Sequence, residues 1–199
     1  MPATDTLAAI KWPNVPACYG WLSLDRRGQW RLKGEIVRHA GLVAFINSHY
    51  SADPAGNWIF QNGPQAVFVA LDYAPLVLRL QADGDPMAHT GADAGAVAAA
   101  YLDDEGNALL VTALGIGLLD DRDLPAFLAD CSDALGETAT EQALLAAMSG
   151  RPDLSWRGMP LRFVPRVDVA ARFGFCAAPA SAKADGARAP VMRPDDTQQ

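Results

Sequence analysis

The chain has 199 residues, of which half are hydrophobic and a fifth are charged, as is usual for a protein with a hydrophobic core. Its formal net charge is −7, and this acidic balance argues against non-specific nucleic-acid binding, which relies on Lys and Arg to neutralise phosphates. The three cysteines form no CxxC pair. We find neither a signal peptide nor the run of roughly 20 apolar residues that a membrane span needs. We therefore expect a cytoplasmic protein that does not enter membranes.

The first 81 residues predict an N-terminal arm and one β-rich module. Residues 1–19 contain three prolines and little periodicity, which indicates an extended arm with at most a short helix at 6–11. Residues 20–81 read as two short strands, a helix over 38–50 and three further strands. The strands are expected at 20–24, 29–32, 57–61, 65–71 and 76–80, with turns rich in Asp, Gly and Pro between them.

The second half predicts a linker and another β-rich module. Residues 82–95 are rich in Asp, Gly and Ala and are interpreted as the linker, and residues 96–176 as the second module. A hairpin of strands at 96–102 and 108–114 is followed by a helix that Asp123 would cap. The apolar side chains of this helix follow a helical stripe through Leu124, Phe127, Leu128, Cys131 and Leu135.

An inserted helix and a tail complete the predicted elements. The helix begins at Thr138, where Glu141 would complete a capping box, and ends at Gly150. Residues 156–169 are expected to be rich in strand. Residues 177–199 contain mainly Ala, Pro, Ser and charged residues, and we expect a disordered tail.

Several features recur in the same order in the two halves. The pattern Leu-Asp-x-x-Gly at 24–28 recurs at 102–106, and Leu-x-x-Phe at 42–45 recurs at 124–127. Short matches of this kind also arise by chance, but their common order favours an internal duplication. The predicted fold class is therefore α+β, with two related small antiparallel β-meander modules that each carry a packed helix.

The first module also resembles a known family. The pattern Asp-x-x-Gly-x-Trp-x-x-x-Gly-x-x-x-Arg at 25–38, followed by Leu-Val-x-Phe at 42–45, resembles an uncharacterised bacterial family of domains of unknown function. The resemblance covers mainly residues 20–80, and Gly63 stands where that family has threonine. It implies two repeated β-rich modules, the second similar to a pleckstrin-homology fold, and a nucleotide-like ligand bound between them in signalling.

Two clusters of basic residues are candidates for an anion site. Arg31 and Lys33 alternate onto one face of a strand with Arg38 nearby, and Arg157 and Arg162 occupy the equivalent end of the second module. Guanidinium groups suit phosphates and carboxylates, so a nucleotide-like or other anionic small molecule is the expected ligand. All five residues would line one groove if the modules pack symmetrically. The alternative is a solvated strand face whose charges form surface ion pairs.

No residue pattern supports an enzyme, a cofactor or a metal site. His39, His49 and His89 are scattered, and Gly115-Ile116-Gly117 lacks the third glycine of a dinucleotide-binding loop. No motif for a nucleophilic serine or cysteine is present.

The sequence therefore predicts a non-catalytic ligand-binding or regulatory protein. Trp30, Trp58 and Trp156 are interpreted as core anchors rather than as stacking platforms for a base. The alternative function is a protein–protein interaction module, or a homo-oligomeric structural protein, that docks a partner through an exposed sheet edge.

Overall fold

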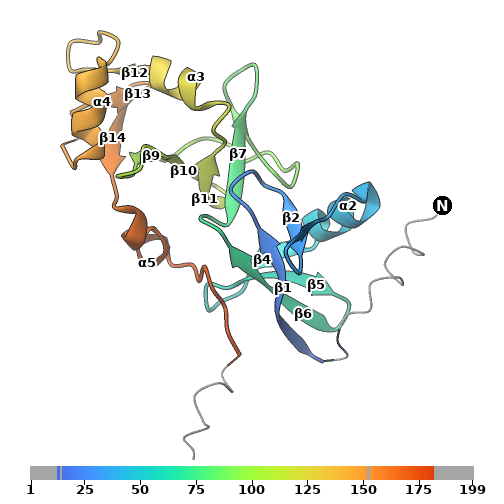
Figure 1. The fold of residues 1–199 in the computed structure, drawn as a ribbon. Coiled ribbons are helices and arrows are strands. Elements are labelled where there is room, and N and C mark those ends of the chain that lie inside the picture. Colours follow the sequence, from blue (N-terminus) through green and yellow to red (C-terminus); the bar gives the residue numbers. More distant parts are fainter. Residues whose placement is uncertain (1–12, 14, 152, 182–199) are drawn as a thin grey trace, which may run out of the picture.

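The computed structural model describes residues 13, 15–151 and 153–181, in which the strands form two mixed sheets (Figure 1). The first sheet has six strands in the spatial order β3-β2-β1-β6-β5-β4. In chain order these are β1 (Ala17–Leu24), β2 (Trp30–Leu32), β3 (Glu35–Ile36), β4 (Tyr50–Ala52), β5 (Trp58–Asn62) and β6 (Gln65–Leu71). The strands β3 and β4 therefore form its two edges.

The second sheet has eight strands in the order β12-β13-β14-β9-β10-β11-β7-β8. They are β7 (Leu76–Leu80), β8 (Pro86–Ala88), β9 (Ala99–Leu102), β10 (Ala108–Thr112), β11 (Gly115–Leu119), β12 (Cys131–Ser132), β13 (Ser155–Trp156) and β14 (Met159–Phe163). This sheet includes β7, which was expected in the first module, and β8, which lies within the expected linker 82–95. The division of the chain into modules at this point stays a prediction.

Four α-helices accompany the sheets in the described part of the chain: α2 (Ala40–Ser48), α3 (Leu124–Ala129), α4 (Glu141–Met148) and α5 (Val169–Phe173). A 3₁₀ helix, η1 (Arg166–Asp168), precedes α5. The protein is thus a β-rich α+β protein. None of the described helices combines the length and the apolar character that a membrane crossing requires.

The expectation of purely antiparallel meanders is wrong. The pairs β1 and β6, β7 and β11, and β9 and β14 run parallel, whereas the other pairs are antiparallel. Parallel strands need a long crossover connection, and several strands intervene in the chain between the members of each pair. Alternating patterns in single strands do not reveal such a pairing.

The two sheets place six strands in matching order. In the first sheet the strands lie in the order β3-β2-β1-β6-β5-β4. Read from β11, the corresponding strands of the second sheet lie in the order β11-β10-β9-β14-β13-β12, which is the same order when β9 is counted as the first strand. In each set the first and sixth strands are the parallel pair. A helix follows the third strand in both sets, and α4 is an insertion in the second set.

Within the described part of the chain, one type of turn occurs at 25–28, 53–56, 103–106 and 133–136, with Asp in its first position and Gly in its fourth. In each turn the Asp Oδ1 accepts hydrogen bonds from the backbone N–H groups two and four residues later. The four glycines have φ between 74° and 83°, a conformation that glycine adopts without steric cost. The turns predicted at 25–28 and 103–106 are confirmed.

Two helices begin later than predicted. The helix expected over 38–50 starts at Ala40, because the side chain of His39 caps α2. The capping box predicted from Thr138 is wrong, since Thr140 caps α4 by accepting a hydrogen bond from the N–H of Ala143 at 3.2 Å. Both starts depend on which polar side chain reaches a free backbone N–H group.

The helix α3 is much shorter than its apolar stripe indicated. It ends at Ala129, so Cys131 lies in β12 and Leu135 is 88% exposed in the fourth Asp turn. Asp123 precedes α3 but does not cap it, because its carboxylate accepts hydrogen bonds from Arg79 Nε at 2.6 Å and from the N–H of Leu80 at 2.9 Å. Contacts with β7 therefore occupy the carboxylate that was expected to cap α3.

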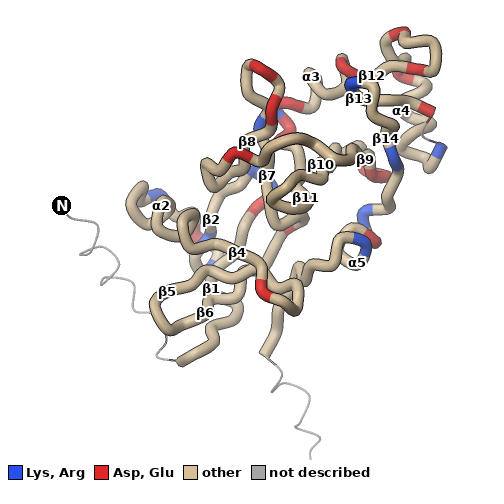
Figure 2. The backbone as a smooth tube through the Cα atoms, turned by 180° about the vertical axis from the view of Figure 1, so that it is seen from behind, with Lys and Arg blue, Asp and Glu red and all other residues tan. Residues whose placement is uncertain are grey.

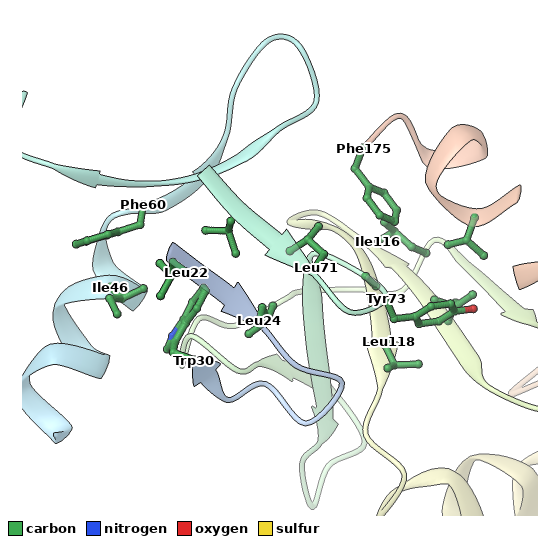
Figure 3. Packing of buried hydrophobic residues seen from close by; sticks show 14 of the residues in the cluster. Leu22, Leu24, Trp30, Ile46, Phe60, Leu71, Tyr73, Ile116, Leu118 and Phe175 are labelled. Carbon is green, nitrogen blue, oxygen red and sulfur yellow. The ribbon is translucent and has the colours of Figure 1, made fainter. Parts of the chain in front are cut away.

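The second sheet is buried on both faces. Along β9, Tyr101 faces a core shared with the first sheet, whereas Leu102 faces a separate core under α3 and α4. Residues of the shared core that Figure 3 labels are Leu22, Leu24, Trp30, Ile46, Phe60, Leu71, Tyr73, Ile116, Leu118 and Phe175. The long apolar stretches in β9 to β11 reflect this burial on two sides.

The ends of the described chain are tied to the first sheet. β1 begins at Ala17, inside the segment expected as an arm, and the carbonyl of Ala177 accepts a hydrogen bond from the N–H of Leu71 at 2.8 Å. The helix expected at 6–11 and residues 182–199 of the expected disordered tail lie outside the described residues.

Candidate functional site

Of the predicted basic residues of the first module, Arg31 lies in β2, Lys33 lies in the β2–β3 turn, and Arg38 lies between β3 and α2. Arg31 Nε and Nη2 donate to Asp25 Oδ2 at 3.2 and 3.1 Å. Lys33 Nζ lies 3.6 Å from the centre of the Trp21 ring, which is a cation–π contact. Arg38 follows β3 and is exposed. Because side chains alternate along a strand, Arg31 points away from the face on which its neighbour Trp30 is buried.

The predicted basic residues of the second module also have partners. Arg157 Nε donates to Asp130 Oδ2 at 2.7 Å, and its Nη1 donates to the carbonyl of Gly84 at 2.8 Å. Arg162 Nη1 donates to Tyr101 Oη at 3.3 Å. Figures 1 and 2 place the end of the second sheet that carries β13 far from β2, so Arg31 and Arg157 are not brought together.

A pocket of about 400 Å³ lies where the two sheets meet, and we call it the junction pocket. Edge strand β4 and the end of α2 form one side, and the loop after β8 and the β10–β11 turn form the other. Its lining residues are Asn47, Tyr50, Ser51, Ala52, Trp58, Leu76, Thr90, Ala92, Ala113 and Leu114. Neither β4 nor β5 carries a charged residue (Figure 2), and the lining contains none.

Aromatic rings form one wall of the junction pocket. The ring of Tyr50 lies 4.8 Å from that of Trp58 and 4.9 Å from that of Trp30, measured between ring centres. Tyr50 Oη donates to the carbonyl of Pro75 at 2.9 Å, which fixes the ring against the chain that leads into the second sheet. Contact between Trp30 of β2 and Tyr50 of β4 shows that the first sheet curls until these strands approach each other.

Asn47 links the aromatic wall to the core. The indole N–H of Trp30 donates to Asn47 Oδ1 at 2.7 Å, and the Trp30 side chain is buried. Asn47 itself lies in the last turn of α2 and lines the junction pocket. It therefore presents a polar group next to the rings of Tyr50 and Trp58.

His89 packs behind this wall, with its ring 5.4 Å from that of Trp30 and 5.8 Å from that of Tyr50. Its Nδ1 accepts a hydrogen bond from the N–H of Val77 at 3.3 Å. Burial lowers the pKa of His89 to about 4, so the ring is neutral near pH 7. The second nitrogen, Nε2, is buried and has no partner among the described residues.

A second pocket, of about 310 Å³, continues from the junction pocket along the same strand. The two pockets share Ala52, Trp58 and Leu114, and the second one extends to Phe173, the last residue of α5, and to Phe175. Leu114 is 39% exposed at the tip of the β10–β11 turn, between the two openings. The sheet junction therefore carries a largely apolar groove, with polar groups at the junction pocket and Asp53 at the second pocket.

A charged network joins the sheets elsewhere along the junction. Tyr73 Oη donates to Asp103 Oδ2 at 2.5 Å, and Asp103 is fully buried. The guanidinium groups of Arg26 and Arg166 lie 5.1 and 5.4 Å from the centre of the Tyr73 ring. Both arginines also pair with Glu105, at 3.7 and 2.7 Å. These groups satisfy one another, which indicates a structural role.

Sequence reasoning did not assign a binding role to the residues that line the junction pocket. Trp58 was interpreted as a core anchor, and it does pack against both hydrophobic cores, but it also lines the pocket. Tyr50 was placed on a helix rather than on β4. The spacing of Asn47 and Tyr50 at a helix end is the sequence signal that could have indicated a binding role. It is a weak signal without knowledge of the strand that follows.

The fold and the junction pocket thus define a β-rich α+β protein of two mixed sheets. Residues 2–180 match the model of the family DUF2944, described as protein of unknown function (DUF2946), and the chain belongs to this family. The expected membership of an uncharacterised domain-of-unknown-function family is confirmed. A comparison with curated proteins gives no match.

Two solved structures of DUF1285 family proteins are similar to this chain. The protein from Silicibacter pomeroyi DSS-3 is 15% identical with a TM-score of 0.48, over 66% of this chain and 85% of that one. The protein from Shewanella baltica OS155 is 17% identical with a TM-score of 0.44, over 54% of this chain and 90% of that one.

Proposed function

We propose that this protein binds a small molecule without transforming it, and that the ring of this ligand lies in the junction pocket. The observation that carries the proposal is the pair of rings, Tyr50 and Trp58, in a pocket of about 400 Å³ between two sheets. Ligand sites favour such junctions, with mostly apolar linings and a few polar groups. Binding there would link the two sheets and suits a regulatory protein of the cytoplasm.

A nucleotide-like ligand remains part of this proposal, with its base in the pocket. The lining offers no positive charge to a phosphate, and burying an unpaired anion costs several kcal/mol. A phosphate would have to lie outside the junction pocket. The alternative placement is an anion held by one of the two basic clusters, Arg31, Lys33 and Arg38 or Arg157 and Arg162, in which Arg31 or Arg157 would leave its aspartate partner.

Thermal shift and calorimetric titration with adenosine and AMP test the proposal. We expect both to raise the melting temperature of the wild type and of Trp21→Leu, because Trp21 lies outside the pocket, but not that of Trp58→Leu. A ligand at 100 times its Kd stabilises by about 2.7 kcal/mol, which is easily measured. If no ring compound binds, the proposal is wrong. If AMP binds but adenosine does not, and Arg31→Gln or Arg157→Gln abolishes the binding of AMP, the ligand site lies at the arginines instead.

A protein partner is the second candidate function, and the position of β4 favours it. β4 is an edge strand whose residues line both pockets, and a partner strand can pair with a free edge while its side chains fill the pockets. Sedimentation velocity over a range of concentrations tests self-association through this edge. A mass that stays that of one chain at all concentrations would exclude the homo-oligomeric form of this alternative.

The proposal includes an internal duplication of the two halves. The matching strand order and the four Asp turns support it. The pleckstrin-homology-like character of the second module stays a prediction, as does a role in signalling.

A further inference from the structure

The chemistry of Trp30 determines how the Asn47 amide is oriented. An indole nitrogen can only donate a hydrogen bond, and Trp30 is 1% exposed, so its N–H needs an acceptor inside the protein. The acceptor is Asn47 Oδ1, at 2.7 Å. Rotating the amide by 180° would place an NH₂ group against the indole N–H, with two donors facing each other. The oxygen of Asn47 is therefore committed to Trp30, and its Nδ2 points elsewhere.

The Nδ2 group of Asn47 is a donor that the junction pocket can use. None of the described residues accepts a hydrogen bond from it, and the Asn47 side chain lines the pocket. The hydroxyl of Tyr50 is already used, since it donates to Pro75. Ser51 and Thr90 also line the pocket, but a hydroxyl group rotates and either donates or accepts. The indole N–H of Trp58 and the Nδ2 group of Asn47 are the lining groups fixed as donors, and the Asn47 group is the one whose orientation the buried Trp30 sets.

The lining also selects by charge and shape. It has no Lys, Arg, Asp or Glu, so an ionised group would enter without a counter-charge. Tyr50 and Trp58 offer ring faces and edges, against which planar apolar rings pack well. The part of a ligand that enters the pocket is therefore uncharged and planar.

We infer that the junction pocket takes an uncharged planar ring that carries a hydrogen-bond acceptor, such as a carbonyl oxygen, and that Asn47 selects it by donating from Nδ2. This inference rests on the proposed function and specifies its ligand. Asn47 thereby acts as a specificity-determining residue, through a group whose orientation the buried Trp30 enforces.

Three ring compounds of similar size test the inference: acetophenone, ethylbenzene and benzoate. They share the ring and differ in carrying a neutral acceptor, no acceptor or a negative charge. Titrations are followed by ¹H–¹⁵N NMR at the indole N–H of Trp58 and the side-chain amide of Asn47. We expect acetophenone to bind the wild type roughly 3- to 10-fold more tightly than ethylbenzene, the value of one net hydrogen bond, and benzoate to bind more weakly than acetophenone.

The variant Asn47→Asp isolates the donor. It keeps an oxygen for the Trp30 N–H and replaces the NH₂ group with a second acceptor, so the preference for acetophenone should disappear. Asn62→Asp is the matched control, because it adds the same charge at the end of β5, outside the pocket lining, and should keep the preference.

The outcomes separate the inference from the proposed function. Equal affinities of the wild type for acetophenone and ethylbenzene, or a preference that survives in Asn47→Asp, would overturn the inference while leaving a ring-binding pocket. A preference for benzoate would also overturn it and would favour an anion site. If none of the three compounds perturbs Trp58, the proposed function itself fails. If Asn47→Asp does not fold, the ratio of the wild-type affinities for acetophenone and ethylbenzene still tests the inference.

Discussion

His89 shows how a single buried ring responds to the packing of two sheets. Its Nδ1 accepts from a backbone N–H, so the proton of the neutral ring must lie on Nε2, which is buried without a partner among the described residues. Protonating Nδ1 would break that hydrogen bond and place a charge among Trp30 and Tyr50. Burial is accordingly the main cause of the lowered pKa, and the charge of Asp25 opposes it.

The stability of the protein should therefore fall between pH 6.5 and pH 4. The pKa of His89 is about 4 in the folded protein and about 6.5 in an unfolded chain. Between these pH values His89 is protonated in the unfolded chain but not in the folded protein, so the free energy of unfolding decreases as the pH falls. The decrease is at most about 3 kcal/mol and levels off below pH 4. Urea unfolding of the wild type at a series of pH values measures the slope.

His89→Gln should flatten that slope, and His49→Gln, at an exposed position after α2, should not. Asp120 affects stability in a different pH range. Its hydrogen bond from Arg122 lowers its pKa to about 2, so the stabilisation that this carboxylate contributes is lost at a lower pH than that of His89. A slope between pH 4 and 6.5 that is unchanged in His89→Gln would contradict the assignment.

Tyr73 contributes to stability through one hydroxyl group. Burial and the hydrogen bond to Asp103 raise its pKa, so the hydroxyl stays protonated and donates to the carboxylate. Tyr73→Phe removes this bond but leaves Asp103 three donors, from Glu105 and Asn107. We expect a loss of about 1–3 kcal/mol, because the acceptor is a buried charge. Chemical denaturation measures it, and Tyr19→Phe in β1 should change stability by less than about 0.5 kcal/mol.

At the scale of elements, the Asp turns explain why this chain forms so many short strands. Each turn supplies an acceptor for two backbone N–H groups and a glycine with positive φ, and both features are local. The turns differ in their surroundings. A Cβ atom on Gly28 would lie 2.6 Å from Cβ of His89, whereas one on Gly34, in the β2–β3 turn, would meet nothing within 4 Å.

This difference predicts two unequal effects of the same substitution. Both glycines have positive φ, so Gly34→Ala should cost about 1 kcal/mol for backbone strain alone. Gly28→Ala adds a clash with Cβ of His89 and should cost about 1–3 kcal/mol more. Melting temperatures of the two variants, measured side by side, give the comparison. Equal losses would show that the turn at 25–28 does not pack on His89 as described.

At the scale of the whole molecule, the two sheets share one hydrophobic core. Leu118 of the second sheet is buried in the same cluster as Leu22 and Phe60 of the first sheet (Figure 3). The charged network around Tyr73 adds polar contacts between the sheets. Neither sheet can lose its partner without exposing apolar surface to water.

The protein should therefore unfold as one cooperative unit. We expect a single calorimetric transition whose calorimetric and van't Hoff enthalpies agree. Leu118→Ala should lower the stability of that whole transition by about 2–5 kcal/mol, whereas Leu135→Ala, on an exposed side chain, should change it by less than about 0.5 kcal/mol. Two resolved transitions, only one of which responds to Leu118→Ala, would show that the sheets are independent.

Local patterns in the sequence indicate the class of the protein and the form of its turns and strands. The Asp-x-x-Gly turns, the short strands and the membership of a family of unknown function follow from residues that are close together in the chain, because a turn aspartate binds its own backbone and a glycine permits positive φ within one turn.

The sheet pairing and the junction pocket, in contrast, result from contacts between residues that are far apart in the chain. β7 joins the second sheet because it pairs with β11, and Asn47, Tyr50 and Thr90 meet because the first sheet curls against the second. The helical stripe that ran on to Leu135 failed because Cys131 pairs with the distant Trp156 of β13 and Leu135 lies in the turn that Asp133 begins. Such contacts form between residues that are far apart in the chain. Neither the periodicity nor the spacing of residues in the sequence indicates which distant residues will be in contact.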